Sequence, residues 1–126
     1  MDRLDDYKYK DKLLIIGAGG HGRVTADIAL KMNRWQEIAF LDDNDSLAAS
    51  MGIRVIGNSS DVYRYLDEYD IFVAIGDNLT RELILSQLET EGASIPILIH
   101  PSAVIGTNVD IGAGTVVMAG VVINCC

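Results

Sequence analysis

The sequence is poor in cysteine, proline and aromatic residues, and it has few basic residues. The 2 cysteines in 126 residues are adjacent, Cys125 and Cys126, which provides neither a disulfide framework nor the spacing of a metal site. Lysine and arginine number 10 against 18 acidic residues, so the net charge is −8 and the clustered positive charge that binds a phosphate backbone is lacking. We therefore expect reduced cysteines, no metal site and no nucleic-acid partner.

Long apolar runs are lacking too. The longest uncharged stretch, 111–126, has 16 residues, fewer than the ~20 that a membrane helix needs. Residues 1–12 carry eight charges and no apolar centre, so they do not resemble a signal peptide. They are predicted to be a charged leader that is disordered or derived from cloning. We expect a cytoplasmic protein without a membrane partner, and a hydrophobic content of 49% predicts one globular domain with a core.

The motif around which the chain is organised is a short apolar run that ends in four glycines. Residues 13–16 are all apolar, which is typical of a strand buried on both faces of a parallel sheet. Three of the glycines have G-x-G-x-x-G spacing, which permits a tight turn into a helix and lets backbone N–H groups approach a phosphate. The predicted binding turn consists of Gly17, Gly19, Gly20, His21 and Gly22. The alternative is a turn that only packs a helix on a sheet.

Polar residues also follow the apolar runs at 38–41 and 71–75. The predicted binding residues at these two strand ends are Asp42, Asp43, Gly76, Asp77 and Asn78. Asp42 lies twenty residues after Gly22, where nucleotide-binding folds place an acid against a ribose hydroxyl. Alternating strands and helices predict a parallel sheet, in which these strand ends meet at one edge. A unit of about ninety residues lacks the second half of a dinucleotide fold, so one nucleotide is favoured over NAD.

The remaining elements follow from local patterns. Apolar residues at helical spacing predict a first helix whose buried stripe is Val24, Ile28, Met32 and Trp35. Further predicted elements are helices at 46–51, 62–66 and 79–89 and strands at 53–56 and 96–99. We expect Asn78 to cap the helix at 79–89, and Ser59 or Ser60 to cap the one before it. Together these elements form an α/β domain predicted to span 13–101.

From Ala103 onward the apolar pattern has a period of six. The two repeating series are Ile105, Ile111, Val117 and Ile123, and Ala103, Val109, Thr115 and Val121. Neither a strand nor an α-helix has this period, whereas each hexapeptide of a β-helix forms one face of a coil. Residues 102–126 are therefore predicted to begin a β-helix; the alternative is an ordinary glycine-rich strand pair.

Four segments precede the hexapeptides in order: Gly-Ala-Gly-Gly-His-Gly at 17–22, Leu-Asp-Asp at 41–43, Ala-Ile-Gly-Asp-Asn at 74–78 and Ile-His-Pro-Ser-Ala at 99–103. With them the chain resembles bacterial sugar O- and N-acetyltransferases, the group of sialic acid O-acetyltransferases and UDP-4-amino-sugar N-acetyltransferases. The resemblance implies a Rossmann-like α/β domain followed by a left-handed β-helix. It also implies a homotrimer that uses acetyl-CoA as donor and a nucleotide-sugar or sugar as acceptor in polysaccharide biosynthesis.

The resemblance also implies roles for parts of the chain. The glycine turn and Asp42-Asp43 would contact the acceptor, and acetyl-CoA would lie along the β-helix between subunits. The family's proton acceptor is a β-helix histidine in coils beyond Cys126, so no catalytic residue is assigned here and this chain is expected to be truncated and inactive by itself. For His21 two roles stay equally open: contact with a ligand, or a structural role in the turn. His100, before a proline, is expected to be a domain-junction residue.

Two functions of other classes stay open at this point. One is a nucleotide-binding regulatory or interaction module without catalysis. The other is a small NAD-dependent oxidoreductase, which the hexapeptides and the missing second nucleotide-binding half oppose.

Overall fold

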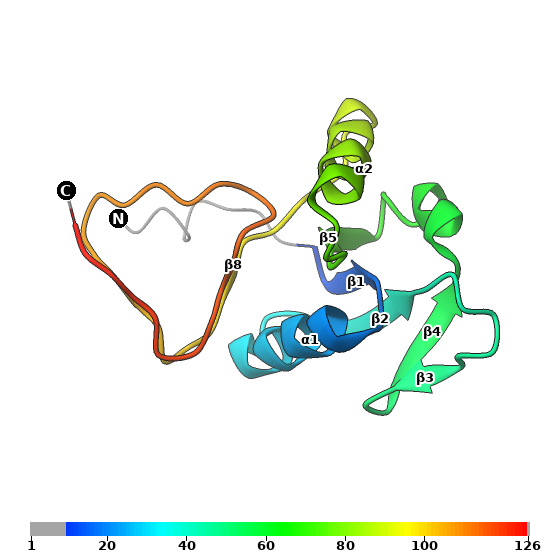
Figure 1. Cartoon of the computed structure of the whole chain (residues 1–126), viewed down its shortest axis with the longest axis horizontal. Coiled ribbons are helices and arrows are strands. Elements are labelled where there is room, and N and C mark those ends of the chain that lie inside the picture. The colour runs from blue at the N-terminus through cyan, green and yellow to red at the C-terminus, as the bar shows by residue number, and fades with distance from the viewer. Residues whose placement is uncertain (1–9, 126) are drawn as a thin grey trace.

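The computed structural model describes residues 10–125 of the chain (Figure 1). It shows an α/β unit with helices on both sides of a sheet, and a β-helical turn that extends away from one end of it. The predicted leader lies outside the described residues up to residue 9, whereas Lys12 already begins the first strand. The boundary between leader and domain stays a prediction.

The central sheet consists of β1 (Lys12–Ile16), β2 (Glu37–Leu41), β3 (Ala49–Ser50), β4 (Ile53–Gly57) and β5 (Tyr69–Val73). The strand order is β3-β4-β2-β1-β5, and every pair is parallel except β3 with β4. β1 has a parallel neighbour on each side, and its four apolar residues are buried and divided between the cores on the two faces of the sheet, as predicted. This confirms a Rossmann-like arrangement, in which the chain leaves β1, β2 and β5 at the same edge.

Helices α1 (Gly20–Met32) and α2 (Asn78–Thr90) and the 3₁₀-helix η2 (Ser59–Arg64) flank the sheet. Side chains alternate along the strands, so the sheet divides the core into two clusters. The cluster shared with α1 contains Leu13, Ile15, Phe40 and Phe72. The cluster shared with α2 and η2 contains Leu14, Ile16, Ile71, Val73 and Leu88. The result is a three-layer α/β/α unit, with α1 and α2 on opposite sides in Figure 1.

The buried stripe predicted for α1 is partly wrong. Ile28 is buried and Met32 packs against the α1-side cluster, but Val24 is 45% exposed. Trp35 is buried although it lies beyond the end of α1. The buried residues of α1 are Gly22, Thr25, Ala26, Ile28 and Ala29. Most of them are small, so this face packs closely on the sheet, and a spacing argument that counts only large apolar residues misses it.

The predicted helix at 46–51 is wrong. The Ser46 N–H donates to Asn44 Oδ1 at 3.1 Å, which closes a turn of the kind that asparagine favours. The chain then forms the β3–β4 hairpin, whose turn residues Met51 and Gly52 have φ values of 56° and 74°. Two successive positive φ angles are typical of a two-residue hairpin turn, so turn chemistry determines this segment.

Two other predicted helices exist with different starts. In place of an α-helix at 62–66, η2 begins at Ser59, with the preceding asparagine as its N-cap instead of a serine. The helix predicted at 79–89 is α2, which is one residue longer at each end. Its N-cap is Asp77, so the prediction that Asn78 caps it is wrong.

The β-helical turn is formed by β6 (Leu98–Ile99), β7 (Val104–Ile105), β8 (Val116–Val117) and β9 (Val122–Ile123). Leu98 pairs in parallel with Val116, and Val104 with Val122, so each strand stacks on the strand three hexapeptides later. The stacking confirms the period of six as a coil. The strand predicted at 96–99 is therefore wrong as a member of the α/β sheet, because β6 pairs with β8.

The coil and the α/β unit share one core. Leu98 is fully buried in the α1-side cluster, and Val116 packs against the same cluster. On the other side of the coil, a side chain at Gly114 would come within 3.5 Å of Leu85 Cδ2 and 3.6 Å of Ile95 Cγ2. The start of the β-helix is thus fixed to the unit that precedes it. Among residues 10–125, no helix is long and apolar enough to cross a bilayer.

Candidate nucleotide-binding site

The glycine turn at the end of β1 contains two kinds of glycine. Gly17 has a φ of +103°, and a Cβ there would lie 2.6 Å from the Ala74 carbonyl oxygen. A Cβ at Gly22 would lie 1.9 Å from the Gly17 carbonyl oxygen, so these two positions admit no side chain. A Cβ at Gly19 or Gly20 would have no atom within 4 Å. The first pair is needed for packing, and the second pair leaves the backbone open to an approaching ligand.

The N-terminus of α1 has no side-chain cap. Its N-cap residue is Gly19, and the first turn contains no acidic residue. By contrast, the Asp77 carboxylate caps α2 by accepting the Thr80 N–H at 3.0 Å. The free N–H groups of a first helical turn carry a positive partial charge. Of the two α-helices within residues 10–125, α1 is therefore the one whose first turn an anion can complete.

Asp42 fixes the glycine turn to the end of β2. Its Oδ2 accepts the Ala18 N–H at 2.8 Å, and its Oδ1 accepts the Asn44 N–H at 2.9 Å. A second hydrogen bond joins the same two segments: the Gly17 N–H donates to the Leu41 carbonyl oxygen at 2.7 Å. Asp42, which the sequence predicts to bind a ribose hydroxyl, thus also holds the glycine turn in place. Each carboxylate oxygen keeps a further lone pair with which to accept a hydroxyl.

The neighbouring acid, Asp43, is occupied elsewhere. Its Oδ1 accepts both the N–H and the hydroxyl of Ser59 at 2.8 Å, which ties the end of β2 to the start of η2. The structure therefore gives Asp43 a structural role beside the site, and its contact with a ligand stays a prediction.

The third strand end, residues 74–78, lies against the glycine turn. The Ala74 N–H donates to the Ile16 carbonyl oxygen at 2.8 Å, and its own carbonyl oxygen leaves no room for a Cβ at Gly17. Hydrogen bonds from the Thr80 hydroxyl and N–H lower the pKa of the Asp77 carboxyl, so it stays ionised as the cap of α2. Asn78 Oδ1 accepts an N–H of Arg81 at 2.7 Å. A side chain at Gly76 would meet open space.

The two histidines have different surroundings. His21 is half-buried in the first turn of α1, where its carbonyl oxygen accepts the Thr25 hydroxyl at 2.8 Å. His100 Nδ1 accepts the Ser102 N–H at 3.0 Å, and the Ser102 hydroxyl accepts the Gly120 N–H at 2.9 Å. His100 thus lies within the coil, between β6 and β7, and its role as a domain-junction residue stays a prediction.

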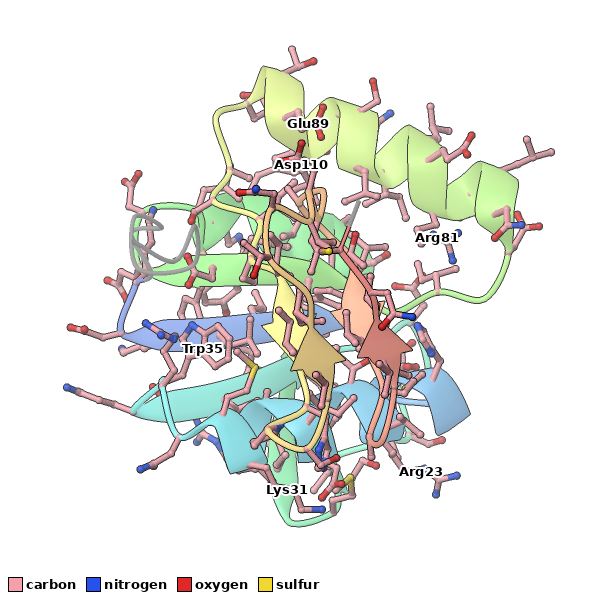
Figure 2. The ribbon with its side chains drawn as sticks, turned by 90° about the vertical axis from the view of Figure 1, so that its left-hand side faces the viewer. Arg23, Lys31, Trp35, Arg81, Glu89 and Asp110 are labelled. Carbon is pink, nitrogen blue, oxygen red and sulfur yellow. The ribbon has the colours of Figure 1, made fainter. Side chains whose placement is uncertain are left out.

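Sequence reasoning missed Asp70, the fully buried acid of β5. It accepts hydrogen bonds from Trp35 Nε1 at 2.8 Å, the Ser94 hydroxyl at 2.6 Å and the Lys10 N–H at 3.0 Å. Burial raises the pKa of the Asp70 carboxyl, although these bonds act in the opposite direction. Its position beside Leu13 is at the amino end of the strands, so it joins three segments far from the glycine turn. Trp35 and Arg81 accordingly lie at opposite ends of the unit in Figure 2.

These features define a class of protein: a Rossmann-like α/β domain with one glycine turn, followed by the start of a β-helix. The comparison with family models is specific. Residues 12–88 match the PglD N-terminal domain, and the chain belongs to this family of sugar N-acetyltransferases.

Relatives of known structure and activity agree with this assignment. The chain is 30% identical over 108 residues to the UDP-N-acetylbacillosamine N-acetyltransferase of Bacillus subtilis (strain 168), which covers 83% of this chain and 50% of the relative. It is 40% identical to the acetyltransferase domain of PglB from Neisseria gonorrhoeae FA1090, with a TM-score of 0.85 over 90% of this chain and 56% of that domain. The same domain has been solved in complex with acetyl coenzyme A.

A third relative has been solved with both CoA and a nucleotide-sugar. It is a variant of the perosamine N-acetyltransferase from Caulobacter crescentus in complex with CoA and GDP-perosamine, 34% identical, with a TM-score of 0.81 over 90% of this chain and 54% of that one. The chain spans about half the length of these relatives. All three of these relatives are named as acetyltransferases.

Proposed function

We propose that this chain supplies the acceptor-binding part of an enzyme that moves an acetyl group from acetyl-CoA to an amine or hydroxyl of a nucleotide-linked sugar in bacterial surface-glycan synthesis. One observation carries the proposal: the first turn of α1 has no cap, and it follows a glycine turn that Asp42 pins in place. The GDP-perosamine in the Caulobacter relative supports a nucleotide-sugar as the occupant.

Each predicted residue then has a role in binding. The N–H groups at Gly19, Gly20 and His21 donate to the diphosphate, because they are the free donors of the α1 N-terminus. Asp42 accepts a ribose hydroxyl with its remaining lone pairs while it holds the turn. Gly17 and Gly22 act through packing alone, since neither has room for a side chain.

The donor and the assembly are proposed by resemblance and by the complexes of the relatives. Acetyl-CoA, the acetyl donor, binds along the β-helix in a homotrimer, and the exposed Val104 and Val122, stacked in β7 and β9, are available to a neighbouring subunit. His100 is not proposed as the base, because the family's proton acceptor is a β-helix histidine in later coils, and His100 Nδ1 already accepts the Ser102 N–H. The cytoplasmic localisation expected from the sequence stays a prediction.

The test is a calorimetric titration of the 126-residue chain with UDP, GDP and NAD⁺. The proposal predicts that UDP or GDP binds more tightly than NAD⁺, because one nucleotide-binding half is present. Tighter binding of NAD⁺ would favour the oxidoreductase and contradict the proposal.

A further inference from the structure

The edge of the sheet that we assign to the nucleotide is rich in acid. Asp42, Asp43 and Asp77 follow two of the three strand ends that meet there. The carboxylates of all three accept backbone N–H groups. A diphosphate placed among them meets like-charge repulsion, which partial charges of one helix N-terminus only partly offset. A cation held at this edge would offset that repulsion.

Arg81, on the first turn of α2, is positioned for that task. Its Nη2 donates to Asn78 Oδ1 at 2.7 Å, which fixes the guanidinium at the start of the helix. Within residues 10–125, Arg81 forms no ion pair, so its other N–H donors remain for a ligand. Three other basic residues are paired with acids: Lys12 with Glu37 and Glu68, Lys31 with Asp27, and Arg64 with Asp61.

The arrangement in space agrees with this role. The segment that leads into α2 touches the glycine turn, since a Cβ at Gly17 would contact Ala74 and Ile75. Figure 2 shows Arg81 beneath the first turn of α2, at the end of the unit where α1 also begins. Arg23, on the first turns of α1, points away from α2 in the same view. The two arginines therefore carry the same charge at the same end of the unit, but only Arg81 lies beside the start of α2, whereas Arg23 points away from it.

We propose that Arg81, held by Asn78, is the cation that binds the diphosphate of the nucleotide-sugar opposite the glycine turn. This inference rests on the proposed function and adds a residue to its site. The planar guanidinium suits this role, because it donates two parallel hydrogen bonds to phosphate oxygens. Asn78, predicted from the sequence as a binding residue, acts here as the residue that positions Arg81.

The experiment compares UDP with uridine, and GDP with guanosine, by calorimetric titration of the 126-residue chain and its variants. Arg81→Gln removes the charge and keeps a good helix former, and thermal unfolding checks that it folds. We expect it to weaken binding of the preferred diphosphate on the order of 10- to 100-fold, the scale of a charge-assisted hydrogen bond. Binding of the nucleoside should stay unchanged, and Arg81→Lys should restore part of the loss.

Two further variants separate position from charge. Arg23→Gln removes the same charge from the start of α1 and should leave diphosphate binding near the wild-type value. Asn78→Ala keeps the charge but frees the guanidinium, so it should cause a smaller loss than Arg81→Gln. Equal losses in Arg23→Gln and Arg81→Gln would overturn the inference, because the effect would then be one of general charge.

The outcomes also distinguish the inference from the proposed function. If UDP or GDP binds the wild-type chain and Arg81→Gln binds it equally well, the role of Arg81 is wrong and the proposed function stands. If neither diphosphate binds the wild-type chain, the proposed function fails and the inference fails with it.

Discussion

Replacing Asp42 tests whether one carboxylate connects the fold to the site. In Asp42→Ala the N–H of Ala18 loses the carboxylate oxygen that accepts it at 2.8 Å. Ala18 is only 4% exposed, so water cannot readily replace this acceptor. The Asn44 N–H also loses its acceptor, but it is exposed and can bind water instead. A buried donor left without a partner costs about 1–3 kcal/mol, and the loss of the exposed bond adds about 0.5 kcal/mol. We therefore expect the free energy of unfolding to fall by about 1.5–3.5 kcal/mol.

The assay is urea unfolding followed by circular dichroism, with calorimetric titration of UDP and GDP on the folded variant. For a chain of this size the loss corresponds to a fall in Tm of roughly 6–12 °C. Asp45→Ala is the matched control, because it removes an exposed acid from the same loop. Asp42→Asn should lose about half as much as Asp42→Ala, since one amide oxygen can still accept one N–H. Asp42→Ala as stable as Asp45→Ala would refute the reasoning.

Three further predictions follow from the structure. Gly22→Ala should leave little folded protein by circular dichroism, because its Cβ would lie 1.9 Å from the Gly17 carbonyl oxygen. Gly20→Ala should keep wild-type stability or gain up to ~1 kcal/mol, because a Cβ there has no atom within 4 Å. Equal stability of the two variants would contradict the packing argument. Burial raises the pKa of Asp70 in the folded state, so the stability gained by protonating this carboxyl is fully present below its unfolded pKa and is lost as the pH rises through the folded pKa. Asp70→Asn should therefore flatten the fall in unfolding free energy above about pH 4. An unchanged pH dependence in urea titrations would refute this. In the coil, the side chains of Val104 and Val122 are 58% and 62% exposed. The chain should therefore self-associate in light scattering, and Val122→Lys should reduce the association. A monomeric wild-type chain, with or without reductant, would rule this out.

The sequence was informative where a pattern has one structural solution. A period of six determines the pairing of Leu98 with Val116, and glycines that admit no Cβ at Gly17 and Gly22 determine the strand-to-helix turn. The acids at strand ends were located correctly because parallel strands end at one edge. Their hydrogen-bond partners were not predictable, because Ser59 and Ala18 approach Asp43 and Asp42 only after folding.

The errors have physical causes of the same kind. The segment 46–51 has a helical cap signal, but the Met51-Gly52 hairpin turn determines its structure. Val24 fits a helical stripe by spacing, yet the small residues of α1 face the sheet. Asp70 was missed because a buried acid in a strand is recognised only from its donors, which come from segments distant in sequence.

The account's central claim is that the uncapped start of α1 binds the diphosphate of a nucleotide. The most direct measurement is a ¹H–¹⁵N correlation spectrum of the 126-residue chain during titration with UDP and GDP. The account predicts that the largest amide shifts fall on Gly19, Gly20 and His21, with smaller shifts at Ala18 and at the start of α2. Saturating shifts confined to the coil at 98–125, or no shifts with either nucleotide, would contradict it.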